Sequence, residues 1–456
     1  MSGPGLMSDK PATLAGGPAQ RQERRRELDW LRAFVVFGLI PFHTAVIFIG
    51  AQGDYVRNAQ SSWLLARLVA FITFWGIPLL FFVSGAATRY TLAARDNRQY
   101  ISERITRLLV PFIFAMLTIM PVQVYVGYLG TPGPHVSFWQ YYGQFMQSLL
   151  GILHGAMPAR GADWIGHLWF IPPLLAISVI MLPLFRFLRS PRGERIINSL
   201  DGVATLSMAL ILFGLPFGLA EVILRVGWPI PGSAAPEALD NWPGFVIFGL
   251  FYIGGFIVYS EPHIQRGLRA WWAPALALGV VTWLLVEGAG AYASVLPGNN
   301  FWFEALIRLL RGYVSWFWVA AIVGFGLRYL TSSGRVVRYL TEATFPIYVL
   351  HMPILTIIGY YVVRWPAGIA FKFIFISVAA MIVTILLFEV FVRHVAPLRF
   401  VFGMSVRPRG EPQDKAKSPH TTRSRPERLS IGAPTKYDSA LSRRRMEKSR
   451  TSQRGA

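Results

Sequence analysis

The sequence contains no cysteine among its 456 residues. This absence excludes disulfide bonds, thiolate metal sites and a cysteine nucleophile, and it leaves the cellular compartment open. Several nucleotide-binding and hydrolase motifs are also missing: there is no P-loop, no GxGxxG after a strand and no GxSxG elbow. A pump driven by nucleotide hydrolysis is therefore not expected.

Charged residues are scarce. They make up 15% of the chain, whereas hydrophobic residues make up 54%. A soluble globular chain has about 25% charged and about 45–50% apolar residues. The chain also contains 15 tryptophans, and aromatic rings gather where a membrane protein meets the water–lipid interface. The composition indicates a membrane protein.

Ten segments are candidate membrane-spanning helices, because a span needs about 20 mostly apolar residues to cross about 30 Å of hydrocarbon. The pattern therefore predicts an all-α, polytopic helix bundle. The sixth segment is short and rich in glycine, and the first is too long for a cleaved signal peptide and lacks a small-residue cleavage site. The expected spans are residues 31–50, 64–86, 108–129, 164–187, 202–224, 244–259, 271–291, 312–330, 344–363 and 370–392.

Acidic residues are few, and the formal net charge is +21. With ten spans, the N-terminus and the loops on its side of the membrane carry 20 lysines and arginines, and the opposite loops carry six. Cytoplasmic loops retain these residues, so the asymmetry predicts that both termini are cytoplasmic and that the chain lies in the cell (inner) membrane. A basic balance can also indicate nucleic acid binding. Here the basic residues lie between the apolar segments and in the C-terminal tail, so no nucleic-acid partner is expected.

Three regions differ in composition. We expect residues 1–24 to be a disordered basic N-terminus, residues 25–400 to be the transmembrane domain and residues 401–456 to be a disordered basic tail. The arginine triplet at 443–445 suits anionic lipid, although a solubilising tail is the simpler reading. Outer loops 130–163 and 226–243 are rich in aromatic residues and suit either sugars or lipid headgroups.

The segment RELDWLRAFVVFGLIPFH, which leads into and through most of the first span, includes Asp29, Arg32 and His43. His43 follows Arg32 by eleven positions, which turn a helix through about 1100°, so the two side chains share a face about 16 Å apart, and Asp29 lies on nearly the same stripe. Ionisable groups inside a membrane are costly and are candidates for function. A histidine can accept a proton from a hydroxyl when its second nitrogen is held. The alternative is a histidine that is hydrogen-bonded for packing alone.

Two later histidines lie among aromatic residues and prolines. His167 is in GHLWFIPP and His351 is in FPIYVLHMP. Prolines interrupt transmembrane helices where a cavity is lined. His167, Trp169, Tyr348 and His351 are therefore candidates to line a cavity.

Two glutamates are also expected inside spans. Each of Glu287 and Glu389 either pairs with a neighbour or holds a histidine tautomer, and we include Glu389 among the candidates to line the cavity. No HxxxH pair is present and no carboxylate stands at ligand spacing from a histidine, so the sequence predicts no metal site.

The segment ERITRLLVP places Arg104 and Arg107 three residues apart at the cytoplasmic start of the third span. On a regular helix this spacing puts both guanidinium groups on one face, where they can grip phosphate groups. The alternative is ordinary anchoring by positive charge on the cytoplasmic side.

These segments together resemble the acyltransferase family 3 membrane proteins. RELDWLRAFVVFGLIPFH resembles the opening span of that family, with its Arg-x10-His motif at Arg32 and His43. ERITRLLVP is similar to the family's Arg-x-x-Arg segment, and GHLWFIPPLL and FPIYVLHMPIL resemble further family segments. The resemblance covers residues 25 to 400 and is nearest to the glucan-biosynthesis protein C type.

The resemblance implies acyl transfer. A cytosolic acyl-CoA would donate an acetyl or succinyl group to a hydroxyl of a carbohydrate or glucan at the outer face. His43 would be the general base, Arg32 and Asp29 would assist it, and Arg104 and Arg107 would bind the CoA. No permanently bound cofactor is expected; the partners are acyl-CoA, the acceptor and the lipid bilayer.

Two other functions remain open from the residues. One is a proton-coupled transporter or flippase for a glycan or lipid precursor, because intramembrane histidine, arginine and glutamate serve proton relays as well. The other is a non-catalytic partner in a polysaccharide assembly complex. The absence of an internal repeat disfavours transporters built from inverted repeats.

Overall fold

The computed structural model describes residues 25–50, 55–153, 165–204, 208–225, 242–293, 301–332 and 334–404. The N-terminus 1–24 and most of the tail 401–456 lie outside the described residues, as does most of loop 226–243. Every regular element within the described ranges is a helix, which confirms the predicted all-α class.

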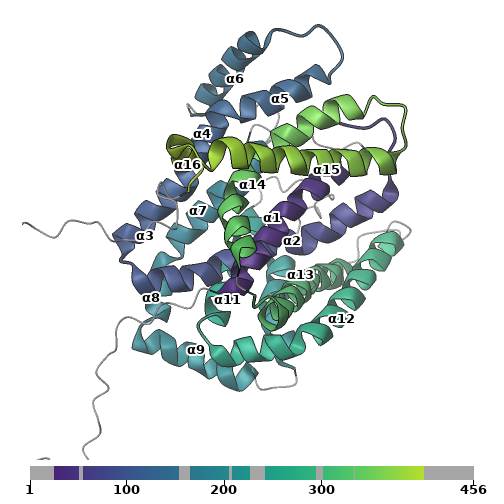
Figure 1. Ribbon diagram of the computed structural model, residues 1–456. Coiled ribbons are helices and arrows are strands. Elements are labelled where there is room, and N and C mark those ends of the chain that lie inside the picture. The colour runs from purple at the N-terminus through teal and green to yellow at the C-terminus, as the bar shows by residue number, and fades with distance from the viewer. Residues whose placement is uncertain are drawn as a thin grey trace, which may run out of the picture. The chain divides into compact units, whose positions relative to one another are not determined.

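Seven helical stretches among the described residues are long and apolar enough to cross a membrane (Figure 1). Each overlaps one of the predicted spans. They are α1 (Arg26–Val46), α2 (Trp63–Ala94), the stretch Asn97–Leu129, α12 (Pro262–Ala293), α13 (Phe301–Tyr329), α14 (Arg335–Val362) and the stretch Ile369–Val392.

Two of these stretches contain a π-helical turn. The stretch Asn97–Leu129 consists of α3 (Asn97–Arg104), the π-helix η1 (Ile105–Leu109), α4 (Val110–Thr118) and α5 (Met120–Leu129). The stretch Ile369–Val392 consists of α15 (Ile369–Leu387) and the π-helix η4 (Phe388–Val392). A π-helical turn widens the helix and changes which side chains share a face, and such turns are frequent at functional sites.

The fourth predicted span is a bent pair. The 3₁₀ helix η3 (Gly166–Phe170) leads into α7 (Ile171–Ile180), and α8 (Leu182–Leu188) follows at an angle of 47°. The fifth and sixth predicted spans correspond to α10 (Ala209–Leu224) and α11 (Trp242–Val258), which have 16 and 17 residues. Length and composition alone thus support seven spans in the described chain, or eight with the bent pair, rather than ten.

Three further helices join the longer ones. They are α6 (Phe138–Leu153), α9 (Pro191–Ala204) and the short α16 (Ala396–Val401). Local sequence explains several helix starts. The Ser62 side chain accepts from the backbone of Leu65 at the start of α2, and Asp96 and Gln99 form a capping box at the start of α3.

Glycines allow α2 and α11 to pack in close contact. A Cβ atom on Gly85 would lie 1.8 Å from the carbonyl oxygen of Tyr252, and one on Gly255 would lie 1.9 Å from that of Phe82. Small residues at helix crossings let backbones approach closely in a membrane. The glycines that make this segment a weak candidate for a membrane span by sequence are therefore the residues that let α11 pack closely against α2.

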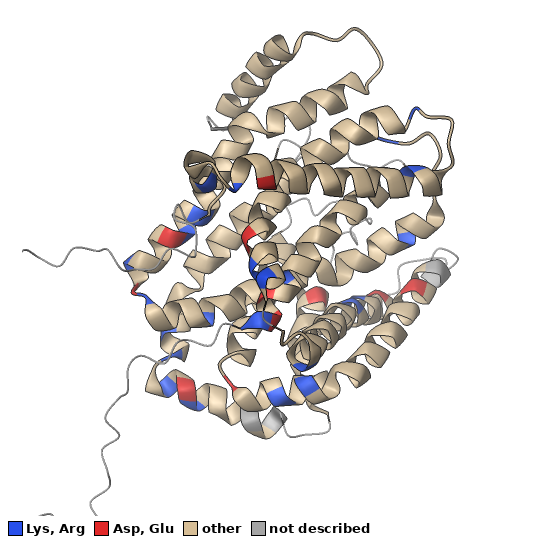
Figure 2. Cartoon of the chain, viewed as in Figure 1, with Lys and Arg blue, Asp and Glu red and all other residues tan. Residues whose placement is uncertain are grey.

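Helix α1 lies within the bundle, where it packs against α2, α13, α14 and α15 (Figure 1). Helix α13 carries Glu304, Arg308 and Arg311 in its first half and Arg328 near its end. Figure 2 shows that α15 is largely free of charge, and its one charged residue, Lys372, lies near its start. This pattern is typical of helices that cross hydrocarbon. Helix α1 differs from α15, because it carries Asp29 and Arg32 near its start and His43 near its end.

Candidate functional site

Three histidines from distant parts of the chain converge. His43 comes from the last turn of α1, His167 from η3 and His351 from the middle of α14. The ring centroids of His43 and His351 are 5.5 Å apart, and those of His167 and His351 are 5.3 Å apart. The structure therefore places these three predicted site residues in one histidine cluster, with His351 between the other two.

The hydrogen bonds of two of these rings determine their tautomers. His167 Nε2 lies 3.2 Å from the carbonyl oxygen of Val349, and His351 Nδ1 lies 2.7 Å from that of Tyr348. A carbonyl oxygen can only accept, so each of these nitrogens carries the hydrogen. In the neutral rings, His167 Nδ1 and His351 Nε2 then present lone pairs. Each is a proton acceptor held in a fixed orientation.

Tyr348 belongs to this cluster. It is buried, its hydroxyl donates to the carbonyl oxygen of His167 at 2.6 Å, and its ring centroid lies 5.9 Å from that of His167. Trp169 lies in a different environment. Its ring packs 6.2 Å from that of Phe248 on α11. Of the two aromatic candidates, Tyr348 contacts the histidines, and Trp169 contributes to aromatic packing beside them.

A glycine makes the bend that presents His167. Gly166 has a φ of +48°, in the left-handed region that side chains other than glycine rarely adopt. A Cβ atom there would also lie 2.7 Å from the Tyr55 hydroxyl and 2.8 Å from the Met120 methyl group. The prolines that follow then start α7. Together these residues turn the chain so that His167 enters the bundle.

Asp29 and Arg32 lie near the opposite end of α1 from His43, and both are half-buried. The charged groups that act on Arg32 are Asp29, on its own helix, and Arg104. Arg104 is in turn acted on by Glu103 of its own helix. Each of the two guanidinium groups therefore has a carboxylate nearby, Asp29 for Arg32 and Glu103 for Arg104.

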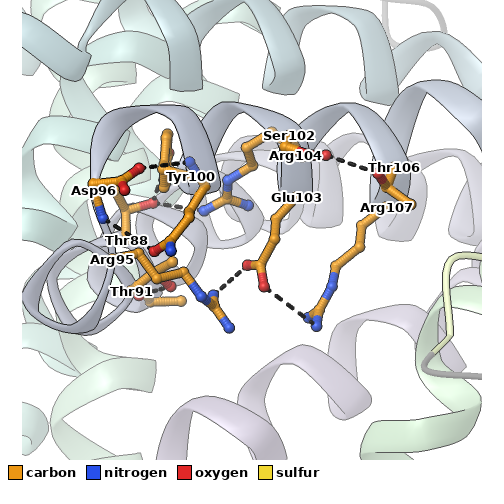
Figure 3. Close-up of polar contacts among 12 residues, drawn as sticks. Thr88, Thr91, Arg95, Asp96, Tyr100, Ser102, Glu103, Arg104, Thr106 and Arg107 are labelled. Atoms are coloured by element: carbon orange, nitrogen blue, oxygen red, sulfur yellow. Dashed lines mark hydrogen bonds and ion pairs between the residues drawn. The ribbon is translucent and has the colours of Figure 1, made fainter. Parts of the chain in front are cut away.

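Arg104 points into the bundle (Figure 3). Its guanidinium group donates to the Thr88 hydroxyl at 2.8 Å and lies 5.0 Å from the centroid of the Tyr100 ring. The Tyr252 hydroxyl joins the same group, at 2.6 Å from that of Thr88 and 3.2 Å from that of Tyr100. Arg104 therefore links α3 to α2 and α11.

Arg107 points elsewhere. Its side chain is 55% exposed and lies 4.0 Å from the Glu103 carboxylate, which also pairs with Arg95 (Figure 3). Arg107 lines a small cleft of about 270 Å³ together with Glu103, Phe400 and Met404. The π-helix η1 begins directly after Arg104, so the spacing that puts the two arginines on one face of an α-helix does not hold here.

The two intramembrane glutamates each pair with an arginine. Glu287 on α12 pairs with Arg67 on α2. Glu389 in η4 accepts from Arg393 at 2.6 Å and lies 3.7 Å from His394. The structure thus places Glu389 in an ion-pair group with Arg393 and His394 at the end of the last long stretch, and not in the cluster of His43, His167 and His351.

Comparison with known proteins places this geometry in a family. A family model described as an acyltransferase domain matches residues 25–389, which is most of the chain. The chain belongs to acyltransferase family 3. This finding confirms the family that the motifs of the first span indicate.

Among the relatives of this family 3 chain are proteins named glucans biosynthesis protein C. The one from Salmonella typhi is 22% identical over 411 residues, which are 86% of this chain and 96% of the relative. The one from Escherichia coli (strain K12 / DH10B) is 23% identical over 399 residues, which are 85% of this chain and 95% of the relative. No solved structure matches the chain.

Sequence reasoning missed one polar residue in this acyltransferase. Gln123 on α5 is fully buried, and neither atom of its amide group has a hydrogen-bond partner among the described residues. The available signal was a lone amide inside an apolar segment. Within the described ranges, no group of three or more His, Asp or Glu side chains is arranged to hold a metal ion.

Proposed function

We propose that the protein is an integral-membrane O-acyltransferase that moves an acetyl or succinyl group from cytosolic acyl-CoA to a hydroxyl of a carbohydrate or glucan at the outer face. The convergence of His43, His167 and His351 at one end of α1, with Arg32 and Arg104 near its other end, carries this proposal. Membership of an acyltransferase family and relatives named for glucan biosynthesis support it.

The proposal includes a topology. The chain crosses the cell membrane ten times, with α10 and α11 as short spans and the bent η3–α7–α8 segment as one span. An even number of spans places both termini on the same side, which is the cytoplasm. The excess of lysine and arginine on that side supports this orientation. Arg32 and Arg104 then lie toward the cytosol, and the three histidines lie in the outer half.

In this arrangement His43 acts as the general base. The acceptor oxygen attacks the thioester carbonyl carbon while its hydrogen passes to a ring nitrogen of His43. The carbon–sulfur bond then breaks, and the CoA sulfur takes the proton back from His43. Burial among helices excludes water, which suppresses hydrolysis of the donor.

The arginines hold the donor in the same proposal. The CoA phosphates lie by Arg107 at the cytoplasmic cleft, while Arg32 and Arg104 steady the part of the donor that enters the bundle. Asp29 orients Arg32, because an aspartate and an arginine at this spacing are neighbours on a helix. Held in this way, the thioester lies within reach of the base, and positioning contributes to the rate.

The test uses purified protein in liposomes with labelled acyl-CoA and a glucose oligosaccharide. His43→Ala should lower transfer by about 10²- to 10⁴-fold, the usual contribution of a general base. His263→Ala, at an exposed histidine on α12, is the matched control and should keep the activity. Transfer that survives in His43→Ala would rule out His43 as the base. Unmodified sugar that crosses the bilayer in response to a proton gradient would favour a transporter instead.

A further inference from the structure

Four polar atoms near the histidine cluster are buried without a hydrogen-bond partner in the described chain. They are both polar atoms of the Gln123 amide group, His167 Nδ1 and His351 Nε2. Gln123 and His351 are 0% exposed and His167 is 6% exposed. A buried polar group without a partner is costly, above all in a membrane, so each such group requires an explanation.

These atoms come from three elements that pack together. Helix α5, which carries Gln123, packs against α14, which carries His351. Gln123 Nε2 lies 3.5 Å from the position that a Cβ atom on Gly166 would take, and His167 is the next residue in the chain. The His167 ring in turn lies 5.3 Å from that of His351. The four atoms thus lie on neighbouring elements, in a path that leads from Gln123 on α5 past the Gly166 backbone to His167 and His351.

The balance of donors and acceptors along this path indicates the ligand. Gln123 Oε1, His167 Nδ1 and His351 Nε2 all accept, because the other nitrogen of each ring already donates to a carbonyl oxygen. Only the Gln123 Nε2 group donates. A phosphate or carboxylate offers acceptors alone and would face three lone pairs without a hydrogen between them. A ligand with several hydroxyl groups offers both donors and acceptors and satisfies the set.

We propose that Gln123, His167 and His351 form a hydroxyl-binding subsite for the acceptor sugar, with Gln123 as the residue that holds a hydroxyl next to the reacting one. This inference rests on the proposed acyl transfer. The amide group binds one hydroxyl as donor and acceptor, and the sugar ring spans from α5 toward His43. Gly166 lets Tyr55, Met120 and the Gln123 amide group pack close to the backbone that precedes His167, because a Cβ atom there would overlap Tyr55 and Met120.

The experiment compares Gln123→Met with wild type in the liposome assay. Methionine has similar volume but removes both hydrogen-bonding atoms. The KM for the glucose oligosaccharide should rise about 10- to 100-fold, as expected for one or two lost hydrogen bonds to a buried neutral group. The KM for acyl-CoA and its slow hydrolysis without acceptor should stay within about twofold. Gln123→Asn, which keeps the amide group, should give a smaller rise.

Two controls keep the result clear. Thr384→Val removes a buried hydroxyl on α15 that donates to the Ala380 carbonyl oxygen of the same helix, and it should leave both KM values unchanged. Binding of the glucose oligosaccharide is also followed by the thermal stabilisation of protein without acyl-CoA. This binding should weaken in Gln123→Met even if the wild type transfers no acyl group, so failure of the subsite and failure of the proposed function are distinguishable. An unchanged acceptor KM, or an effect on kcat alone, would overturn the subsite and leave ordered water as the partner of these atoms.

Discussion

Arg104 and Arg107 are three residues apart, yet they have different surroundings. Arg104 is held by Thr88 and Tyr100 inside the bundle, whereas Arg107 is exposed at a cleft beside Glu103. A charge-assisted hydrogen bond in a partly buried site contributes more to stability than an exposed ion pair does. The two residues should therefore differ in what their loss affects.

We expect Arg104→Gln to destabilise the protein by about 1.5–3 kcal/mol, because a hydrogen bond to a charged group is lost from the Thr88–Tyr100–Tyr252 group. Arg107→Gln should leave the melting temperature unchanged and raise the KM for acyl-CoA about two- to fivefold, as the loss of an exposed charge does. Thermal unfolding in detergent and donor titration measure the two effects. Equal melting temperatures for both variants would contradict the structural role of Arg104.

At the scale of elements, breaks in helical regularity position the site. The left-handed Gly166 turns η3 so that His167 meets α14, and the π-helix η1 separates the directions of two nearby arginines. The 47° bend between α7 and α8 belongs to the same set of breaks. Prolines and glycines cause such breaks, and in a membrane they are tolerated where neighbouring helices satisfy the backbone.

The crossing of α2 and α11 gives an element-scale prediction. Gly85→Ala should destabilise the protein by about 1–3 kcal/mol or more, because the new methyl group overlaps the Tyr252 carbonyl and forces the helices apart. Gly288→Ala is the matched control, since a Cβ atom on that helical glycine meets nothing within 4 Å. It should be neutral or slightly stabilising. Melting temperatures of the purified variants decide the comparison, and similar values for the two would argue against a close crossing.

At the scale of the whole molecule, the absence of cysteine makes the topology easy to test. Single cysteines can be placed at Gln60, between α1 and α2, and at Ser332, between α13 and α14; both positions are exposed. The proposed topology puts Gln60 outside and Ser332 in the cytoplasm. An impermeant thiol reagent should label Gln60→Cys in intact cells, and Ser332→Cys only after the membrane is opened. The reverse pattern would mean that the bundle is inverted.

The sequence by itself determined the class of the protein, the positions of its apolar helices and the stripe of Asp29, Arg32 and His43. These features depend on composition and on the 3.6-residue period, which are local properties of the chain. The Arg-x10-His motif also indicated the family that the comparison with known proteins then confirmed. The number of spans differs between the sequence pattern and the helix lengths, because α10 and α11 have 16 and 17 residues and are shorter than a regular span.

Only the tertiary structure decided which of the candidate residues meet. It brought His167 and His351 to His43, placed Glu389 with Arg393, turned Arg104 inward and revealed Gln123 as a buried amide close to Gly166. None of these follows from local periodicity. Each depends on which helices pack together and on where glycines, prolines and π-helical turns change the direction of the chain. The pairing of distant helices is set by side-chain packing across the bundle, which a single helix does not encode.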